Sequence, residues 1–140
     1  MHLQLITLHG VRVDQDIYEL IAPTAAGEIA IFPGHEPVVT LAVPGALAVR
    51  HEKNTPDQEL EYFAISGGIL EISQKAIRVL VDEADHGDNI IEAESQAALD
   101  RALKLRDEAK DQVELEKASQ LIDRHQVRLQ VADLQRRRRR

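Results

Sequence analysis

Residues 27–37 read Gly27-Glu28-Ile29-Ala30-Ile31-Phe32-Pro33-Gly34-His35-Glu36-Pro37, a short apolar alternation that runs into a turn. Pro33 fixes its own φ and pushes Phe32 towards extended backbone, while Gly34 is free to adopt a positive φ. Pro37 prevents a helix from starting at His35. The stretch therefore predicts a strand that ends in a fixed turn.

Turn residues and charge divide the chain into two parts. All seven glycines and all five prolines lie before Asp88, and none occurs from Asn89 to Arg140. Residues 1–88 carry 5 Lys and Arg against 14 Asp and Glu, a net charge of −9. Residues 89–140 carry 12 against 10, a net charge of +2. We therefore expect two domains, 1–88 and 89–140, of different structure.

The first part contains β-compatible runs at intervals of about ten residues, which is typical of an all-β sandwich or barrel. Several runs have period two, so that Leu60, Tyr62 and Ala64 share one face. Gly67-Gly68 separates two runs, and its freedom to adopt positive φ predicts a hairpin turn. We expect an N-terminal antiparallel β-sandwich with strands near residues 3–8, 11–22, 28–32, 45–51, 59–66, 68–73 and 76–82.

From Ile90 onwards, apolar residues recur at three- or four-residue multiples, which is typical of amphipathic helices. The first stripe is rich in alanine, which buries little area and predicts a weakly held helix: Ile91, Ala98, Ala102, Leu105 and Ala109. The second stripe comprises Leu115, Ala118, Ile122, His125, Leu129 and Ala132. Residues 107–112 between them contain neither glycine nor proline, so the C-terminal two-helix segment is allowed to be a hairpin or one extended helix.

The composition excludes several classes of function. The absence of cysteine excludes disulfides, thiolate metal sites and a thiol nucleophile. A net charge of −7 argues against general nucleic-acid binding by the whole chain. No run approaches 18 apolar residues and the N-terminus lacks a signal-peptide pattern, so the sequence predicts a soluble, unexported protein.

No group of residues has the pattern of a catalytic site. The four serines lie outside any Gly-x-Ser-x-Gly motif, and the turn at residues 27–34 lacks the Lys-Ser/Thr of a phosphate loop. His35 has no second ligand at metal spacing, which favours a turn or interface residue over a metal ligand. We therefore expect no enzyme activity, no bound cofactor and no metal.

Three stretches, in order along the chain, carry a resemblance to a known family. Residues 27–37 resemble the Gly-Glu-x-Gly-Ile-x-Pro-Gly-His-x-Pro run of the epsilon subunit of F-type ATP synthases, the family of bacterial and chloroplast epsilon and mitochondrial delta chains. Residues 62–72 are similar to its strand-Gly-Gly-strand hairpin and residues 79–84 to its last sandwich strand. Residues 128–134, followed by five arginines, resemble its second C-terminal helix. The resemblance covers nearly all 140 residues.

The resemblance implies a non-catalytic rotor subunit of the central stalk. It implies that the sandwich binds the gamma shaft and touches the loops of the membrane c-ring, with Glu28 and His35 near those loops. It also implies that the helices fold on the sandwich or extend along the shaft, where basic side chains meet an acidic lever segment of the beta subunit and hinder ATP hydrolysis. Those basic candidates are Arg128, Arg136, Arg137, Arg138, Arg139 and Arg140. The implied location is peripheral, at the cytoplasmic face of a bacterial cell membrane, in a hetero-oligomer that translocates H⁺ or Na⁺.

The chain departs from the family at one motif. Family members that bind ATP on this subunit carry Ile/Leu-Asp-x-x-Arg-Ala, whereas the segment here is Ile91-Glu92-Ala93-Glu94-Ser95-Gln96. Because no fixed guanidinium would meet the phosphates, we expect no ATP sensing through this motif.

The residues alone leave alternatives open. Arg136 to Arg140 allow three interpretations: a solvated tail, a contact to nucleic acid or anionic lipid, or a segment that docks on an acidic protein surface. The rival to the rotor subunit is a free-standing adaptor whose basic helical arm binds a second partner, such as RNA. An enzyme with a β-domain binding cup is poorly supported, because the chain has only two Phe, two Tyr and no Trp to line it.

Overall fold

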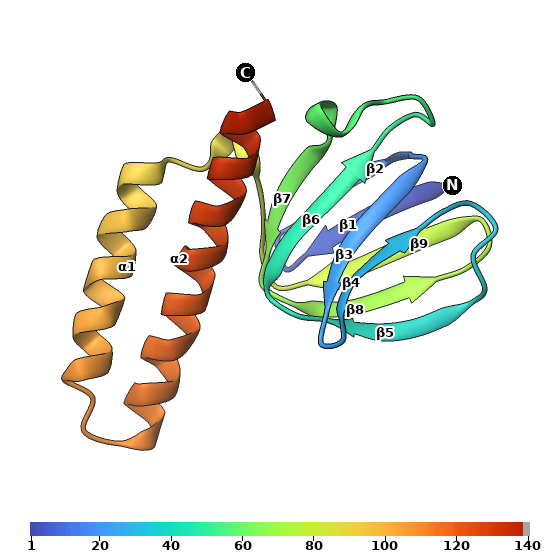
Figure 1. Ribbon diagram of the computed structural model, residues 1–140. Helices are drawn as coiled ribbons and strands as arrows, with labels where there is room; N and C mark the ends of the chain where they lie inside the picture. The colour runs from blue at the N-terminus through green and yellow to red at the C-terminus, as the bar shows by residue number, and fades with distance from the viewer. Residues whose placement is uncertain (139–140) are drawn as a thin grey trace.

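Ten strands followed by two helices make up residues 1–138, the part of the chain that this computed structural model describes (Figure 1). The strands are β1 (His2–Thr7), β2 (Gly10–Asp16), β3 (Glu19–Thr24), β4 (Gly27–Ile31), β5 (Val38–Ala42), β6 (Gly45–Arg50), β7 (Glu61–Ile65), β8 (Gly68–Ile72), β9 (Ala76–Val81) and β10 (Ala84–His86). Single 3-10 turns are η1 (Asp57–Glu59) and η2 (Gly87–Asn89). The predicted fold class, a β-sandwich followed by two helices, is confirmed.

The strands form two layers around one core. One layer contains β4, β3, β6, β7 and β10, and the other contains β5, β8, β9, β1 and β2. The layers are joined where Thr24 of β3 pairs with Ala42 of β5. Neighbours run antiparallel except β1 and β9, which pair in parallel. Alternate strand residues fill the space between the layers, among them Leu3, Leu5, Leu20, Ile31, Leu47, Leu70, Ile77 and Val79, all 0% exposed.

The predicted strand over 11–22 is in fact two strands in different layers. β2 pairs with β1, whereas β3 pairs with β4 and β6. The chain changes partners at Ile17, whose N–H donates to the Met1 carbonyl at 2.8 Å, and Tyr18, whose N–H donates to the Arg50 carbonyl at 2.9 Å. The apolar pattern continues through the change because both strands contribute to the same core.

The predicted hairpin turn at Gly67-Gly68 is wrong. β7 pairs with β6 and β10, while β8 pairs with β5 and β9, so the two glycines carry the chain from one layer to the other. Gly67 has a φ of +95°. The backbone of Gly68 lies so close to β9 that a Cβ on it would meet the Leu80 carbonyl oxygen at 1.9 Å. Both glycines are required, but by a crossing between layers rather than by a hairpin.

Two strands were absent from the prediction. β5 begins directly after Pro37, where the proline pattern indicated only a turn. β10 has three residues, two of which, Asp85 and His86, are polar, so no apolar alternation marks it.

The C-terminal segment is a hairpin of α1 (Glu92–Asp107) and α2 (Gln112–Arg138) rather than one helix that continues through residues 107–112. The break is fixed by a reciprocal cap. The N–H of Glu114 donates to Asp111 Oδ1 at 2.8 Å, and the N–H of Lys110 donates to Glu114 Oε2 at 2.9 Å. Asp111 and Glu114 thus have the Asp-x-x-Glu spacing of a helix start, which stops α1 without glycine or proline.

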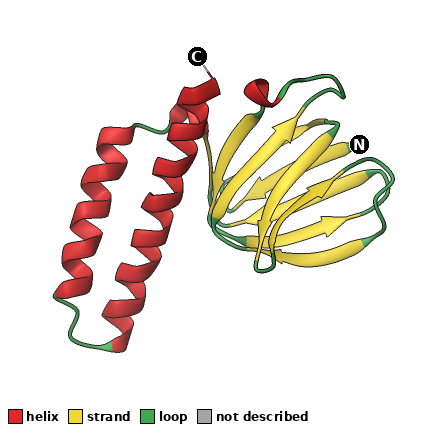
Figure 2. Cartoon of the chain, in the orientation of Figure 1, coloured by secondary structure: helices red, strands yellow, loops and turns green. Residues whose placement is uncertain are grey.

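The hairpin lies to one side of the sandwich and contacts it through the C-terminal half of α2, from Arg124 onwards (Figures 1 and 2). One face of α2 packs on α1 through a cluster of Leu99, Ala102, Leu103, Leu121, Ile122 and Leu129. Ile91 and Leu105, expected in the α1 stripe, are 55% and 52% exposed, and the buried positions of α1 are Ser95, Leu99 and Ala102. Within residues 1–138, neither helix has the length and apolar character needed to cross a membrane.

Candidate functional site

A row of apolar side chains crosses the outer face of one layer. The strand registers place Leu41 opposite Ile69, Ile69 opposite Leu80, Leu80 opposite Ile6, and Ile6 opposite Val11. Paired residues point to the same side of a sheet, so these five side chains, which we call the apolar row, extend across β5, β8, β9, β1 and β2. Leu41 is 67% and Val11 55% exposed. A row of this length on a solvated face is typical of an interaction surface.

Polar and charged side chains lie beside the apolar row. Glu71 is paired with Arg78 on the next line of the same face, with Arg78 Nη1 at 3.2 Å from Glu71 Oε2. Gln4 follows on β1, while Val39 of β5 extends the apolar surface and is 71% exposed. An apolar centre with a charged margin has the anatomy of a protein interface.

α2 packs on the outer face of the opposite layer, over β6 and β7. Val127, Val131 and Ala132 pack there against Ala46, Tyr62 and Ala64 of β6 and β7, together with Ile90. Val131 is 0% exposed, and burial raises the pKa of Tyr62. The chain's own helix therefore covers the β6 and β7 part of one sheet face and leaves the outer face of the other layer open.

Three ion pairs join α2 to the end of the sandwich around β10 and to the first residue of α1. Arg124 Nε lies 2.9 Å from Glu83 Oε2, and Arg136 Nη1 lies 2.8 and 3.0 Å from the two carboxylate oxygens of Glu92. Arg128 forms an ion pair with Asp85, and its Nε donates to Ser95 Oγ at 3.4 Å. We call Arg124, Arg128 and Arg136 the arginine row, because they lie at positions four or eight residues apart on one side of α2.

The structure also places Glu28 and His35. Glu28 lies beside the turn at the start of β4, while His35 follows the other end of that strand, where its Nδ1 is 2.8 Å from the Glu36 carbonyl. The loop holding His35 is tied to the β8–β9 turn by the Gly34 N–H, which donates to the Gln74 carbonyl at 3.0 Å. Across the described chain, no ion pair or hydrogen bond joins Glu28 to His35. They occupy opposite ends of β4 rather than one cluster.

The C-terminal arginines are not a uniform tail. α2 continues to Arg138, Arg136 pairs with Glu92 and Asp133, and Arg137 pairs with Asp133 at 3.1 Å. These carboxylates offset the repulsion that five like charges would produce. Arg139 and Arg140 lie outside the described residues.

The four residues at the altered ATP motif have partners or positions of their own. Glu92 holds Arg136, buried Ser95 accepts from Arg128, and Gln96 donates to Asp100 at 3.0 Å. Ile91 precedes the first turn of α1 and is exposed. Among residues 1–138, no three His, Asp or Glu side chains are placed to hold a metal ion.

Two buried side-chain atoms of α2 have no hydrogen-bond partner within the described structure: His125 Nδ1 and Gln135 Oε1. Burial lowers the pKa of His125, and the guanidinium groups of Arg124, Arg128 and Arg101 lower it further, against a smaller opposing effect of Glu83. Because these effects favour the uncharged imidazole, His125 is neutral at physiological pH.

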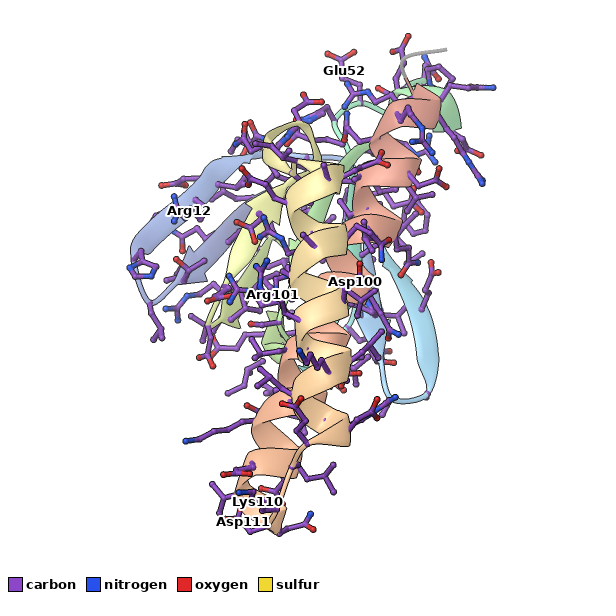
Figure 3. The ribbon with its side chains drawn as sticks, turned by 90° about the vertical axis from the view of Figure 1, so that its left-hand side faces the viewer. Arg12, Glu52, Asp100, Arg101, Lys110 and Asp111 are labelled. Atoms are coloured by element: carbon purple, nitrogen blue, oxygen red, sulfur yellow. The ribbon has the colours of Figure 1, made fainter. Side chains whose placement is uncertain are left out.

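Figure 3 shows Arg101 and Asp100 on α1, with Lys110 and Asp111 at the hairpin tip, away from the sandwich.

Sequence reasoning missed the apolar row and the carboxylates that hold the arginine row. The first has a sequence signal, since Val39, Leu41 and Ile69 occupy positions where a half-exposed strand would carry polar residues. The carboxylates that hold the arginine row have a clearer sequence signal. Residues 82–94 contain six acidic residues and no Lys or Arg: Asp82, Glu83, Asp85, Asp88, Glu92 and Glu94.

An antiparallel-rich sandwich with one open apolar face, carrying a helical hairpin on the other, defines a class of two-part interaction proteins. Residues 1–87 match the family described as the ATP synthase, Delta/Epsilon chain, beta-sandwich domain. The chain is 34% identical over 139 residues to the ATP synthase epsilon chain of Laribacter hongkongensis, covering 99% of this chain and 96% of that protein. It is 33% identical over 135 residues to that of Rippkaea orientalis, covering 94% and 96%. The chain belongs to the delta/epsilon family of ATP synthase chains.

Solved structures share the fold. A chain in the cryo-EM structure of the Euglena gracilis mitochondrial ATP synthase, OSCP/F1/c-ring, in rotational state 1, matches with a TM-score of 0.76 at 21% identity, over 89% of this chain and 76% of that one. A chain in the Tetrahymena thermophila mitochondrial ATP synthase central stalk/c-ring structure matches with a TM-score of 0.61 at 13% identity, over 94% and 96%. At these identities the likeness shows the fold.

Proposed function

We propose that this chain is a non-catalytic rotor subunit of the central stalk of an F-type ATP synthase. Its sandwich binds the gamma shaft and the loops of the c-ring, so that ring rotation turns the shaft. The observation that carries this proposal is the apolar row, because the outer face of β5, β8, β9, β1 and β2 is the large apolar surface that the chain's own helices leave uncovered. The family match supports the same assignment.

A rotor subunit must transmit torque through a body that does not deform. The sandwich meets this requirement, since its core is closed between two hydrogen-bonded layers and close-packed interiors resist deformation. Glu28 and His35 at the ends of β4 are the proposed contacts to the ring loops. Membrane association then occurs through the complex, as a peripheral subunit at the cytoplasmic face.

The helical hairpin is the proposed restraint on ATP hydrolysis. Its small contact with the sandwich, limited to the C-terminal part of α2, supports an element with two arrangements of similar free energy. In the extended arrangement, basic side chains of α2 meet the acidic lever segment of the beta subunit. The candidates are Arg128 and Arg136 to Arg140.

The test of the shaft contact is binding of gamma by the variant Leu41→Asp/Ile69→Asp. Charges placed in the centre of an apolar interface weaken binding by at least about tenfold. The matched control is Gln58→Glu/Gln74→Glu, which adds two charges at exposed positions away from the apolar row. Full binding by Leu41→Asp/Ile69→Asp with an intact fold would overturn the proposed shaft contact. Absence of gamma binding by the unaltered chain would favour a free-standing adaptor.

A further inference from the structure

The arginine row of α2 faces an acidic segment of the same chain. Arg124, Arg128 and Arg136 pair with Glu83, Asp85 and Glu92, respectively. All three carboxylates belong to residues 82–94, which we call the acidic segment and which contain no Lys or Arg. The segment contains β10, η2 and the start of α1, so Glu83 and Asp85 tie α2 to the sandwich, whereas Glu92 ties it to the first turn of α1.

The ion pairs make up a large share of the contacts that hold the hairpin in place, because the apolar contact between α2 and the sandwich is small. On the sandwich side it consists of Ala46, Tyr62, Ala64 and Ile90, of which two are alanines. Towards the other end of α2, an open cleft lined by Pro44, Ser66, Lys117 and Leu121 lies between the helix and the sandwich. Arg128 and its partner are the most enclosed pair, with side chains 19% and 38% exposed. Solvent screens such a pair less than a fully exposed one.

We propose that the acidic segment is an internal competitor for the arginine row. While Glu83 and Asp85 hold Arg124 and Arg128, and Glu92 holds Arg136, an outside acidic protein surface is excluded from the row. Release of the hairpin from the sandwich frees Arg124 and Arg128 for that surface, and separation of α2 from α1 frees Arg136 from Glu92. The identity of the outside surface as the beta-subunit lever rests on the proposed function. The internal competition itself rests only on the ion pairs and on their position at the hairpin's origin.

The competition follows from geometry and charge. A guanidinium that places its N–H groups on one carboxylate presents fewer donors to another, and the nearby acidic groups repel an approaching anion. Each partly exposed ion pair shifts an equilibrium by about 1.5- to fivefold. Removing two pairs is therefore expected to raise the ratio of released to docked hairpin by on the order of tenfold, provided the pairs act independently.

Release is measurable on the full chain by thiol labelling, because the natural sequence has no cysteine. The variant Ala64→Cys places one thiol beneath α2, where Ala64 is 5% exposed, so its labelling rate reports hairpin release. We expect Glu83→Gln/Asp85→Asn to raise that rate by on the order of tenfold. The matched control is Glu71→Gln, which removes the ion pair with Arg78 on the open sheet face and should leave the rate unchanged.

A second thiol separates release from global unfolding. Val79→Cys lies in the core at 0% exposure and should label at the same rate in both backgrounds. Charge reversal tests the specific pair: Asp85→Arg and Arg128→Asp should each raise the Ala64→Cys rate, and the double reversal should lower it again. An unchanged rate in Glu83→Gln/Asp85→Asn, or no recovery in the double reversal, would overturn the internal tether.

Competition is tested with a hexaglutamate peptide as the acidic probe. At low salt, Glu83→Gln/Asp85→Asn should bind the peptide more tightly than the natural sequence, by about the factor seen in thiol labelling. Arg124→Gln/Arg128→Gln/Arg136→Gln, combined with the same two substitutions, should remove that increase, while any binding by Arg137 to Arg140 is common to all the chains compared. Faster labelling without tighter peptide binding would overturn the competition. None of these measurements uses the assembled ATP synthase. If labelling and peptide binding change as expected but the chain does not slow ATP hydrolysis by the catalytic hexamer, the competition stands and only the proposed function is contradicted.

Discussion

Gly68 in β8 lies directly against the carbonyl oxygen of Leu80 in β9, at a distance that leaves no room for a side chain: a Cβ on Gly68 would stand 1.9 Å from that oxygen. The contact occurs where the chain passes from one layer of the sandwich to the other. The crossing, and with it the closure of the core, depends on this glycine.

Gly68→Ala is therefore expected to lower the free energy of unfolding by about 3 kcal/mol or more, because strand backbone must move to relieve the overlap. Gly34→Ala is the matched control, since Gly34 has a φ of +84° but a Cβ added to it would meet no atom within 4 Å. It should cost only about 1–2 kcal/mol of backbone strain. Urea unfolding of both variants measures the difference, and equal losses would show that the Leu80 contact is unimportant.

Val131→Ala tests the docking of the hairpin on the sandwich. Val131 is 0% exposed against β6 and β7, and removal of two carbons costs about 1.6 kcal/mol. Because the contact lies between the two parts, α2 should release more readily while strand amides keep their hydrogen-exchange protection. Val113→Ala, at a position 60% exposed, should change neither. Loss of protection throughout the strands would show that the two parts unfold as one unit.

His125 predicts a pH dependence of hairpin stability. Burial, with Arg124, Arg128 and Arg101 nearby, lowers its pKa from 6.5 in the folded state. The unfolded state then binds the proton more readily, so the stability is complete above the unfolded pKa and is lost as pH falls through the folded one. Glu83 faces the same group and opposes the effect.

The measurement is urea unfolding between about pH 7.5 and 5.5 for the natural sequence and His125→Gln, a window above the ordinary pKa range of Asp and Glu, which limits their contribution. The natural sequence should lose more stability on acidification than the variant, and the other histidines cancel in the comparison. Identical pH profiles would contradict a lowered pKa at His125.

Replacement of Arg136 to Arg140 by glutamine is expected to weaken the restraint on ATP hydrolysis at low salt. Contacts between exposed charges fade as the screening length falls to about 3 Å at 1 M salt, so the natural and altered chains should then behave alike. Hydrolysis by the catalytic hexamer with gamma, titrated at both salt concentrations, measures this. Equal restraint at low salt would leave these arginines without a role in it.

Much of the fold could be predicted from local pattern. Period-two alternation indicated the sandwich, and the loss of Gly and Pro after Asp88 together with three- and four-residue spacing indicated the helices. Pairing partners could not be predicted in the same way. Gly67-Gly68 has the composition of a hairpin turn, and only the positions of β5 and β9 make it a layer crossing.

The helical break and the interaction surfaces differ in how much the sequence reveals. The Asp111-x-x-Glu114 cap was readable but carries no glycine or proline, so the break stayed ambiguous. The apolar row depends on registers between strands distant in sequence, as with Val11 and Leu41. The partners of Arg128 and Arg136 depend on the hairpin folding back, which a helix pattern does not specify.

The most direct test of the central claim is ATP hydrolysis by the cognate catalytic hexamer with gamma, titrated with the full chain and with residues 1–88. Pull-down on gamma accompanies it, and strand hydrogen exchange checks that the shorter chain is folded. The rotor-subunit account predicts that both chains bind gamma and that only the full chain slows hydrolysis. Failure of both folded chains to bind gamma would contradict it.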